Sequence, residues 1–263
     1  MELNVPGATL YYEVRGAGPL LVFVCGGPTD ADVFAPIADA LADRYRVVTY
    51  DPRGNSRSAL AGPPVDQDMD VHGDDVARLI DEVGGAPALV FGNSGGAMIG
   101  MNAIARHADK VRALIAHEPP CVTLLPDGAE VLEAMRRAHE LGMREGVMAG
   151  FGAFMKLTGI DMTPPPGRKQ ETSERMRANL TFFVEHGIVP IASFRPDIAV
   201  LKQRRVVVGA GTESAGELAH RTAIALAAAL GVPATPFPGG HGGYNRYVAA
   251  FADAIGTAYA SLR

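Results

Sequence analysis

The feature that most constrains this chain is an apolar run that ends in a glycine-rich turn. Ala88–Phe91 has the composition of a buried strand, Gly92-Asn93-Ser94-Gly95-Gly96 follows at once, and Ala97–Arg106 has the spacing of a helix. Ser94 therefore stands at the centre of a Gly-x-Ser-x-Gly pattern in a strand–turn–helix context. Such a turn can raise a single serine above the edge of a sheet.

The turn also explains why the pattern needs its glycines. The serine adopts a strained backbone conformation, and the residues two before and two after it nearly touch, so Gly92 and Gly96 must lack side chains. The N-terminal amides of the following helix point at the reacting group and favour a developing negative charge. The pattern predicts a nucleophile at Ser94, and the alternative is a glycine-rich turn in which the serine is incidental.

The rest of the chain alternates strand-like and helix-like segments. Leu20–Val24 is apolar without alternation, which is typical of a strand covered on both faces. The alternation predicts an α/β fold, a mostly parallel sheet with helices on both faces. The expected strands are Glu2–Val5 and Thr9–Val14 (a hairpin around Pro6-Gly7), Leu20–Val24, Arg46–Tyr50, the strand before Ser94, Ala113–His117, Arg205–Val208 and Ala234–Phe237. The expected helices of this part are Asp32–Ala42, Asp70–Val83, Ala97–Arg106, Gly216–Leu230 and Arg246–Leu262.

The alternation breaks after Pro119-Pro120. Helical segments are expected at Ala129–Leu141, Glu145–Leu157 and Glu171–Glu185, with no buried strand between them. Pro164-Pro165-Pro166-Gly167 separates the second from the third. We therefore expect a core formed by residues 1–120 and 196–263, interrupted by a helical cap at 121–195.

Composition limits the class of protein and its partners. The chain has 263 residues, 48% hydrophobic and 20% charged, with a net charge of −5, which suits one globular domain with an insertion. Neither a basic run nor a long apolar span is present, so we expect no nucleic-acid or membrane partner. Two cysteines and the absence of a signal peptide predict a reduced, cytoplasmic protein. No cluster with metal-ligand spacing occurs, so neither a metal nor a cofactor is expected.

A serine nucleophile needs a base, and His241 is the candidate. It lies in Pro238-Gly239-Gly240-His241-Gly242-Gly243, after the last short strand and before the last helix. Loops at the carboxyl ends of parallel strands meet at one edge of the sheet, and the flanking glycines let the loop bring the imidazole there. The alternative is a flexible loop with a surface histidine.

Two glutamates are candidates for the acid that orients the base. Glu118 directly follows the strand Ala113–His117, and Glu213 follows the strand Arg205–Val208 in Thr212-Glu213-Ser214. Either gives the chain order serine, acid, histidine. A structural ion pair is the alternative role for Glu118, and capping of the next helix is the alternative for Glu213. Because capping explains Glu213 without catalysis, the sequence favours Glu118.

The oxyanion hole needs two backbone amides. One is expected from Gly95, directly after the nucleophile, and the other from the loop Cys25-Gly26-Gly27-Pro28. Pro28 has no N–H, so Gly27 is the expected donor. Cys25 is expected to be a small buried residue, with a reactive thiol as the alternative.

These residues resemble the α/β-hydrolase superfamily over nearly the whole chain. Cys25-Gly26-Gly27-Pro28 looks like its His-Gly-Gly-Pro oxyanion loop, with cysteine in place of histidine. The segment Asp51-Pro52-Arg53-Gly54-Asn55-Ser56-Arg57-Ser58 looks like its Asp-x-Arg-Gly-x-Gly-x-Ser loop. His117-Glu118, together with that segment and Thr212-Glu213-Ser214, is similar to the zearalenone-type lactone hydrolases. In those enzymes the acid is a glutamate at the place of Glu118, so the resemblance implies the α/β-hydrolase fold and a Ser94–His241–Glu118 triad.

The sequence thus predicts a serine hydrolase that cleaves an ester or lactone of a fairly apolar small molecule. Carbon–carbon bond hydrolysis and cofactor-free perhydrolysis use the same triad and stay open, as does a non-catalytic binding protein of the same fold. A nicotinamide site at Gly209-Ala210-Gly211 is disfavoured, because Ser214 stands where the third glycine is needed. The substrate and the assembly stay open, a homodimer included.

Overall fold

The computed structural model describes residues 1–160 and 173–262. Its central element is one sheet with the strand order β1-β2-β4-β3-β6-β7-β8-β9, and β5 pairs with β2 beside it. From β4 to β9 neighbouring strands are parallel, whereas β1, β2 and β4 pair antiparallel. The strands are β1 Glu2–Val5, β2 Ala8–Arg15, β3 Leu20–Val24, β4 Arg46–Tyr50, β5 Ala59–Leu60, β6 Ala88–Asn93, β7 Val111–His117, β8 Val206–Gly211 and β9 Ala234–Phe237. The mostly parallel sheet confirms the predicted α/β class.

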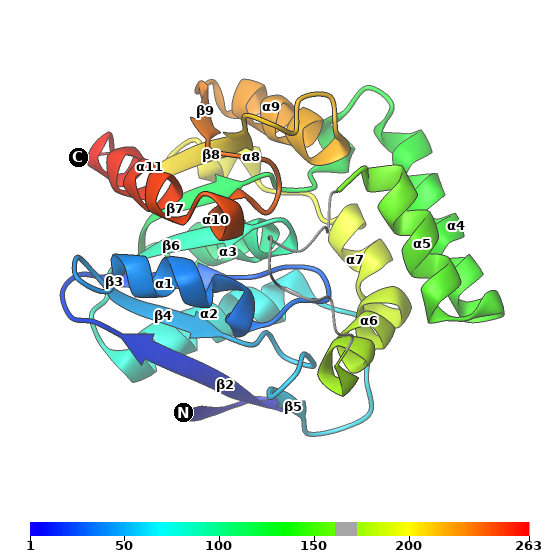
Figure 1. The fold of residues 1–263 in the computed structure, drawn as a ribbon, viewed down its shortest axis with the longest axis horizontal. Coiled ribbons are helices and arrows are strands. Elements are labelled where there is room, and N and C mark those ends of the chain that lie inside the picture. Colours follow the sequence, from blue (N-terminus) through cyan, green and yellow to red (C-terminus); the bar gives the residue numbers. More distant parts are fainter. Residues whose placement is uncertain (161–172, 263) are drawn as a thin grey trace.

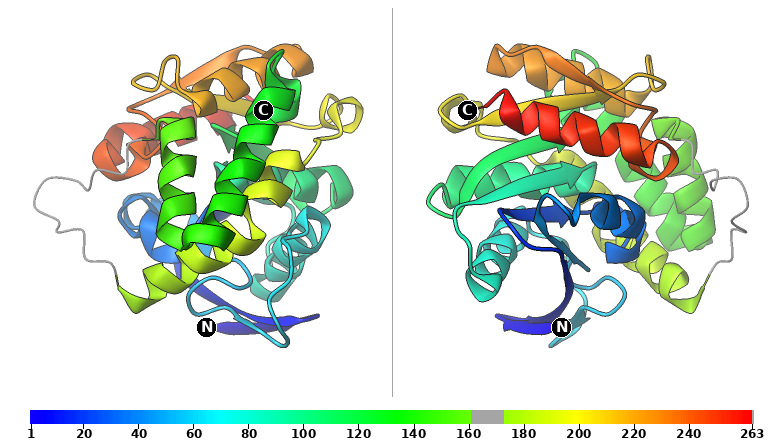
Figure 2. Two further views of the ribbon diagram at one scale, coloured as in Figure 1. Left: turned by 90° about the vertical axis from the view of Figure 1, so that its right-hand side faces the viewer. Right: turned by 60° about the vertical axis from the view of Figure 1, so that its left-hand side comes forward.

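Helices cover both faces of this sheet (Figures 1 and 2). Alternate residues of the parallel strands enter two separate cores because successive strand side chains point to opposite faces. Val22 and Val90 belong to the core under α2, α3 and α9, whereas Phe23 and Phe91 belong to the core under α1 and α11. The helices of this part are α1 Ala35–Leu41, α2 Met69–Val83, α3 Gly95–Arg106, α8 Ile198–Leu201, α9 Leu218–Leu230, α10 Gly243–Arg246 and α11 Val248–Ala260.

The longer helical segments that follow β7 in sequence pack together at the end of the sheet where β6 runs into α3 (Figure 1). They are α4 Gly128–Glu145, α5 Val147–Thr158, α6 Glu174–His186 and α7 Ile188–Ser193. The predicted start of the third helix at residue 171 and the predicted Pro164–Gly167 separator lie outside the described residues. The division into a core and a cap at 121 and 195 stays a prediction.

Several predicted boundaries were wrong, each for a local reason. The expected helix Asp32–Ala42 begins as a 3₁₀ turn at Ala31–Phe34, and α1 follows with Pro36 in its first turn, where the missing N–H costs no hydrogen bond. The expected last helix Arg246–Leu262 begins only at Val248, as α11, because Tyr247 leaves the helical conformation at φ −119° and ψ 46°. Arg246 is the last residue of the separate short helix α10. The two short helices α7 and α8 and the two-residue strand β5 were missed, since elements this short leave almost no periodicity.

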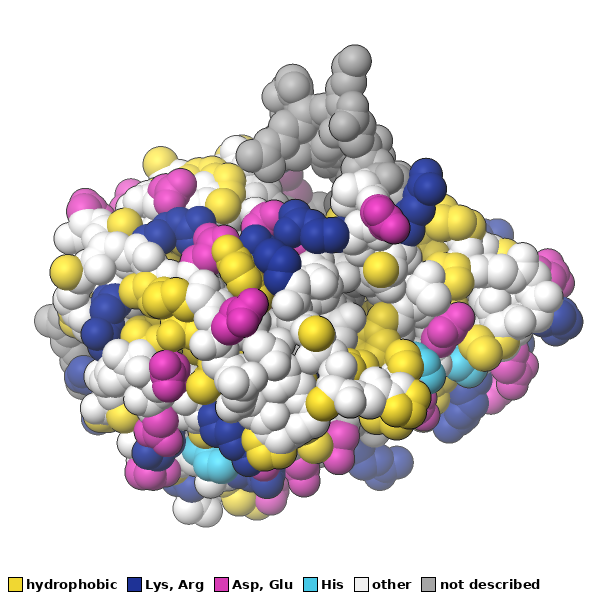
Figure 3. Space-filling view, turned by 90° about the horizontal axis from the view of Figure 1, so that it is seen from below, with side chains coloured by type: hydrophobic (Ala, Val, Ile, Leu, Met, Phe, Trp, Pro, Cys, Tyr) yellow, Lys and Arg dark blue, Asp and Glu magenta, His cyan; other side chains and the backbone are white. Residues whose placement is uncertain are grey.

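The surface mixes both signs of charge. On the face drawn in Figure 3, acidic and basic side chains are interspersed, with hydrophobic side chains scattered among them. No helix within the described residues has the length and apolar character needed to cross a membrane.

Candidate active site

Ser94 lies at the tip of the turn between β6 and α3. Its backbone is strained, with φ 58° and ψ −127°, a region that side-chain-bearing residues rarely adopt. The glycines make the turn possible: a Cβ on Gly92 would lie 2.4 Å from the carbonyl oxygen of Gly96, and one on Gly96 would lie 2.0 Å from that of Val24. Ser94 itself is half-buried and lines a cavity of about 680 Å³.

The structure brings His241 and Glu118 together. Nδ1 of His241 donates a hydrogen bond to Oε2 of Glu118 at 2.8 Å, with the imidazole 11% exposed and the carboxylate fully buried. His241 follows β9 and Glu118 follows β7, so both reach the same sheet edge as Ser94. His241 and Ser94 line the same cavity. Since Nδ1 is engaged by the carboxylate, Nε2 is the ring nitrogen left for chemistry with Ser94.

The other oxygen of Glu118 is held by two further donors. Oε1 accepts from the amide of Gly211 at 2.9 Å and from the hydroxyl of Ser214. Burial by itself would raise the pKa of Glu118, but the hydrogen bond from His241, the nearby imidazoles of His117 and His241, and the hydroxyl of Ser214 lower it to about 2. The carboxylate is therefore charged at neutral pH despite its burial.

Glu213 takes a different position. Its side chain is exposed, and Oε1 accepts from the hydroxyl of Tyr247 at 2.5 Å. The alternative role of Glu213, capping of the next helix, is not observed, because α9 begins only at Leu218 with Glu217 at its N-cap position. Glu213 lines the cavity from the loop after β8, whereas Nδ1 of His241 is bonded to Glu118.

The two amides expected for an oxyanion hole lie side by side. Gly27 and Gly95 both line the cavity, and a Cβ on Gly95 would lie 3.5 Å from the nitrogen of Gly27. Among the described residues, neither amide has a hydrogen-bond partner, so both are available to a ligand. Cys25 is buried beside this loop with Sγ 3.9 Å from the carbonyl oxygen of Tyr50, and burial raises the pKa of its thiol. That environment fits the small buried residue rather than the reactive thiol.

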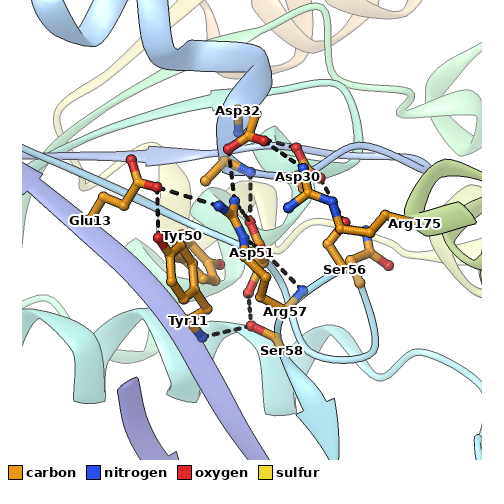
Figure 4. A network of polar contacts seen from close by, with 12 residues as sticks. Tyr11, Glu13, Asp30, Asp32, Tyr50, Asp51, Ser56, Arg57, Ser58 and Arg175 are labelled. Carbon is orange, nitrogen blue, oxygen red and sulfur yellow. Dashed lines mark hydrogen bonds and ion pairs between the residues drawn. The ribbon is translucent and has the colours of Figure 1, made fainter. Parts of the chain in front are cut away.

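Sequence reasoning missed the polar network that holds the loops around the site (Figure 4). The guanidinium of Arg57 forms two hydrogen bonds to the buried carboxylate of Asp51, at 2.7 and 2.9 Å, and a third to Asp32 at 2.9 Å. From α6, Arg175 reaches the same Asp32 at 2.8 Å. The Asp51–Ser58 motif was the available signal, but its partners in α6 lie far away in sequence.

A second bridge joins α6 to the same loop. The side-chain oxygen of Asn179 accepts from the amide of Ser56 at 2.7 Å, and its Nδ2 donates to the hydroxyl of Ser56 at 2.9 Å. Ser56 in turn donates to Asp30 at 2.6 Å. Asn179 is 1% exposed, so this contact is protected from water.

The cavity above Ser94 is mainly apolar. Helices α4 to α7 and the start of α9 provide hydrophobic side chains, and the loops after β8 and β9 provide polar ones. The apolar lining includes Met135, Phe151, Phe154, Met155, Phe183, Ile188, Ile191 and Leu218. Within the described residues, no group of three or more His, Cys, Asp or Glu side chains could hold a metal ion.

Comparison with known proteins gives the family. Residues 19–158 match the family described as alpha/beta hydrolase fold. The uncharacterized hydrolase YraK of Bacillus subtilis (strain 168) is 36% identical over 259 residues, which cover 96% of this chain and 93% of that protein.

Two solved structures share the fold at low identity. A thermophilic esterase from Thermogutta terrifontis has a TM-score of 0.77 and 21% identity, covering 100% of this chain and 99% of its own. The enol-lactonase from Burkholderia xenovorans LB400 has a TM-score of 0.66 and 21% identity, covering 99% of this chain and 100% of its own. The narrower similarity to zearalenone-type enzymes stays a prediction. The family match and the long alignment with YraK lead to one conclusion: this chain belongs to the alpha/beta hydrolase fold family.

Proposed function

We propose that this protein is a serine hydrolase that cleaves an ester or lactone of an apolar small molecule. The observation that carries the proposal is the 2.8 Å hydrogen bond between His241 and the buried carboxylate of Glu118, in the wall of the cavity that Ser94 lines. A charged acid, an imidazole and a serine on a strained turn are the parts that acyl transfer requires. Two structures of similar fold, an esterase and an enol-lactonase, support an ester or lactone as the class of substrate.

The mechanism follows from the roles of these groups. Ser94 Oγ attacks the carbonyl carbon while His241 Nε2 takes its proton, and the negative charge that develops on the carbonyl oxygen is stabilised by the amides of Gly27 and Gly95. His241 then gives the proton to the leaving alcohol, and an acyl-enzyme forms on Ser94. In the second half of the reaction, His241 takes a proton from a water molecule, which attacks the acyl-enzyme and releases the carboxylic acid product from Ser94. Throughout, Glu118 orients the imidazole and stabilises its protonated form.

The cavity supports a small apolar substrate. Its volume of about 680 Å³ lies within the range of ligand sites for small molecules. The phenylalanine, methionine and isoleucine side chains of α4 to α7 would contact the apolar part of the substrate. A minority of polar groups, such as Asn245 and Arg246, would contact its polar end.

A panel of p-nitrophenyl esters and aryl lactones tests the proposal, with the wild-type protein compared with Ser94→Ala and His241→Ala. We expect turnover by the wild type and its loss, by about 10⁴-fold or more, in both variants while they stay folded. An organophosphonate should label Ser94 and leave Ser94→Ala unlabelled. Turnover that survives in Ser94→Ala, or a wild type that neither turns over nor is labelled, would contradict the proposal.

A further inference from the structure

The loop between β3 and the 3₁₀ turn at Ala31–Phe34 contains an internal hydrogen bond at the site. The hydroxyl of Thr29 donates to the carbonyl oxygen of Gly26 at 2.6 Å. Thr29 is half-buried and lines the cavity together with Gly26 and Gly27. A side chain three residues further along the chain therefore fixes one carbonyl group of the oxyanion loop.

The carbonyl group of Gly26 shares a peptide with the Gly27 amide, which is one of the two expected oxyanion donors. The C=O of Gly26 and the N–H of Gly27 belong to the same planar peptide, which is trans, so the two bonds point in opposite directions. A donor that holds the carbonyl oxygen on one side therefore keeps the amide hydrogen on the other. The hydroxyl of Thr29 thus sets the direction of the Gly27 N–H.

The direction of the Gly27 N–H matters because the loop that contains it packs against the start of α3, next to the Gly95 amide. A Cβ on Gly26 would lie 2.4 Å from the nitrogen of Gly95 and 2.6 Å from that of Gly96, so the loop rests directly on the start of α3. Gly27 has φ +60°, a left-handed conformation that a glycine adopts without strain. The amide of Gly27 therefore lies next to that of Gly95, and a small rotation of its peptide would separate the two donors.

The following peptide is held from a different loop. Nδ2 of Asn55 donates to the carbonyl oxygens of Gly27, at 3.3 Å, and Thr29, at 2.8 Å. Asn55 is 3% exposed. With Asn55 fixing the backbone after Gly27, Thr29 is the side chain that controls the peptide before it.

We propose that Thr29 is a positioning residue for the oxyanion hole: its hydroxyl orients the Gly26–Gly27 peptide so that the Gly27 N–H faces the substrate oxygen. This inference rests on the proposed hydrolase function. The direction of the Gly27 N–H matters most in the transition state, when negative charge has developed on the substrate oxygen. Losing the Thr29 hydroxyl therefore lowers transition-state stabilisation more than substrate binding. Removing an oxyanion donor costs about 10²–10³-fold in kcat, and losing only its orientation costs less, about 10- to 100-fold.

The test compares Thr29→Val, which keeps the shape and removes the hydroxyl, with Thr29→Ser, which keeps the hydroxyl. With p-nitrophenyl butyrate, kcat of Thr29→Val should fall about 10- to 100-fold while KM changes by less than about threefold. Thr29→Ser should recover most of the rate. The inhibition constant of a trifluoromethyl ketone, which forms an oxyanion on Ser94, should rise in parallel with the loss of kcat/KM in Thr29→Val. Thermal unfolding is measured for every variant, and Thr29→Ala replaces Thr29→Val if the valine does not fold.

Three results would overturn the inference. The first is a Thr29→Val enzyme with the kcat of the wild type, and the second is an equal loss in Thr29→Ser and Thr29→Val. The third is a loss confined to KM. If instead Ser94→Ala retains the wild-type rate, the proposed function itself fails and the role of Thr29 fails with it. The Ser94→Ala measurement thus separates the two failures.

Discussion

His241 donates from Nδ1 to Oε2 of Glu118 at 2.8 Å, across 123 residues of sequence. The two residues meet because β7 and β9 are parallel to their shared neighbour β8, so the loops that follow them emerge at the same edge. The Oε1 atom of the same carboxylate is occupied by Gly211 and Ser214. Glu118 is therefore fixed on both of its oxygens, which holds the imidazole in a single orientation.

Replacing Glu118 separates the two candidate acids. Glu118→Gln should lower kcat by about 10³–10⁴-fold, because an amide neither stabilises the imidazolium nor favours the required tautomer. The matched control is Glu213→Gln, which keeps an acceptor oxygen for the hydroxyl of Tyr247, loses only an exposed charge and should change kcat by less than about threefold. Steady-state kinetics on one ester compare the two variants, and a larger loss in Glu213→Gln would reassign the acid.

Glu118 should also contribute to stability in a defined pH range. Its pKa is lowered from 4.5 to about 2 in the folded protein. Its stabilisation is thus complete above pH 4.5 and is lost as the pH falls through about 2, a total of about 3 kcal/mol. Urea unfolding should find that the stability difference between wild type and Glu118→Gln shrinks over this range. A stability difference between the two proteins that stays constant from pH 5 to about 2 would contradict this expectation.

Gly96 should tolerate no side chain. A Cβ there would lie 2.0 Å from the carbonyl oxygen and 2.6 Å from the carbonyl carbon of Val24, and backbone atoms cannot move aside cheaply. Gly96→Ala should destabilise the protein by about 3 kcal/mol and displace Ser94, with a large loss of activity. The control is Gly152→Ala in α5, where no atom lies within 4 Å and alanine should stabilise the helix by about 0.5–1 kcal/mol. Urea unfolding and ester turnover measure both effects.

His72 is a buried histidine whose removal should stabilise the protein. Within the described residues neither ring nitrogen has a hydrogen-bond partner, and the side chain is 1% exposed. Burial, with the nearby charge of Arg53, lowers its pKa from 6.5 to about 3. Replacing it with leucine removes an unsatisfied polar group, which favours His72→Leu by about 1 kcal/mol at pH 7.

The advantage of His72→Leu should grow in acid. Because the unfolded chain binds a proton on His72 below pH 6.5 and the folded protein does not until about pH 3, the wild type loses stability as the pH falls between these values. Between pH 6.5 and pH 5 the difference should widen by about 1.5 kcal/mol. Urea unfolding at several pH values measures it, and parallel pH profiles for the two proteins would show the expectation to be wrong.

The hydrogen bonds between Asn179 and Ser56 should stabilise the packing of α6 against the loop that contains Ser56. Asn179→Leu removes two hydrogen bonds and leaves the Ser56 amide without its acceptor, which should cost about 1–3 kcal/mol. On the same helix, Thr181→Val removes only a local hydrogen bond to the carbonyl of Arg177 and should cost less than about 0.5 kcal/mol. Limited proteolysis of α6 and urea unfolding compare the variants. Equal stability of the two would mean that the contact does not hold α6.

The sequence alone determined the α/β class and the strand–turn–helix form around Ser94. Both depend on local regularities: apolar strands alternating with amphipathic helices, and a glycine at position 92, where the backbone of the turn approaches itself. The need for glycine at position 96 comes instead from the neighbouring strand β3, whose Val24 carbonyl a Cβ there would meet. A histidine between glycines after a strand is also a local signal. Short elements such as α7 and β5 leave no such signal, and they were not predicted.

Only the tertiary structure distinguishes the surroundings of Glu118 from those of Glu213. Both follow a strand in sequence, but Glu118 leaves β7, which lies between β6 and β8, and its carboxylate is buried against His241. Glu213 leaves β8 one strand nearer the edge and lies exposed beside Tyr247. The links from Thr29 to Gly26 and from Asn179 to Ser56 likewise depend on the path of the folded backbone. A sequence pattern specifies which side chains are present near a turn, whereas the contacts between distant loops arise only when the whole sheet assembles.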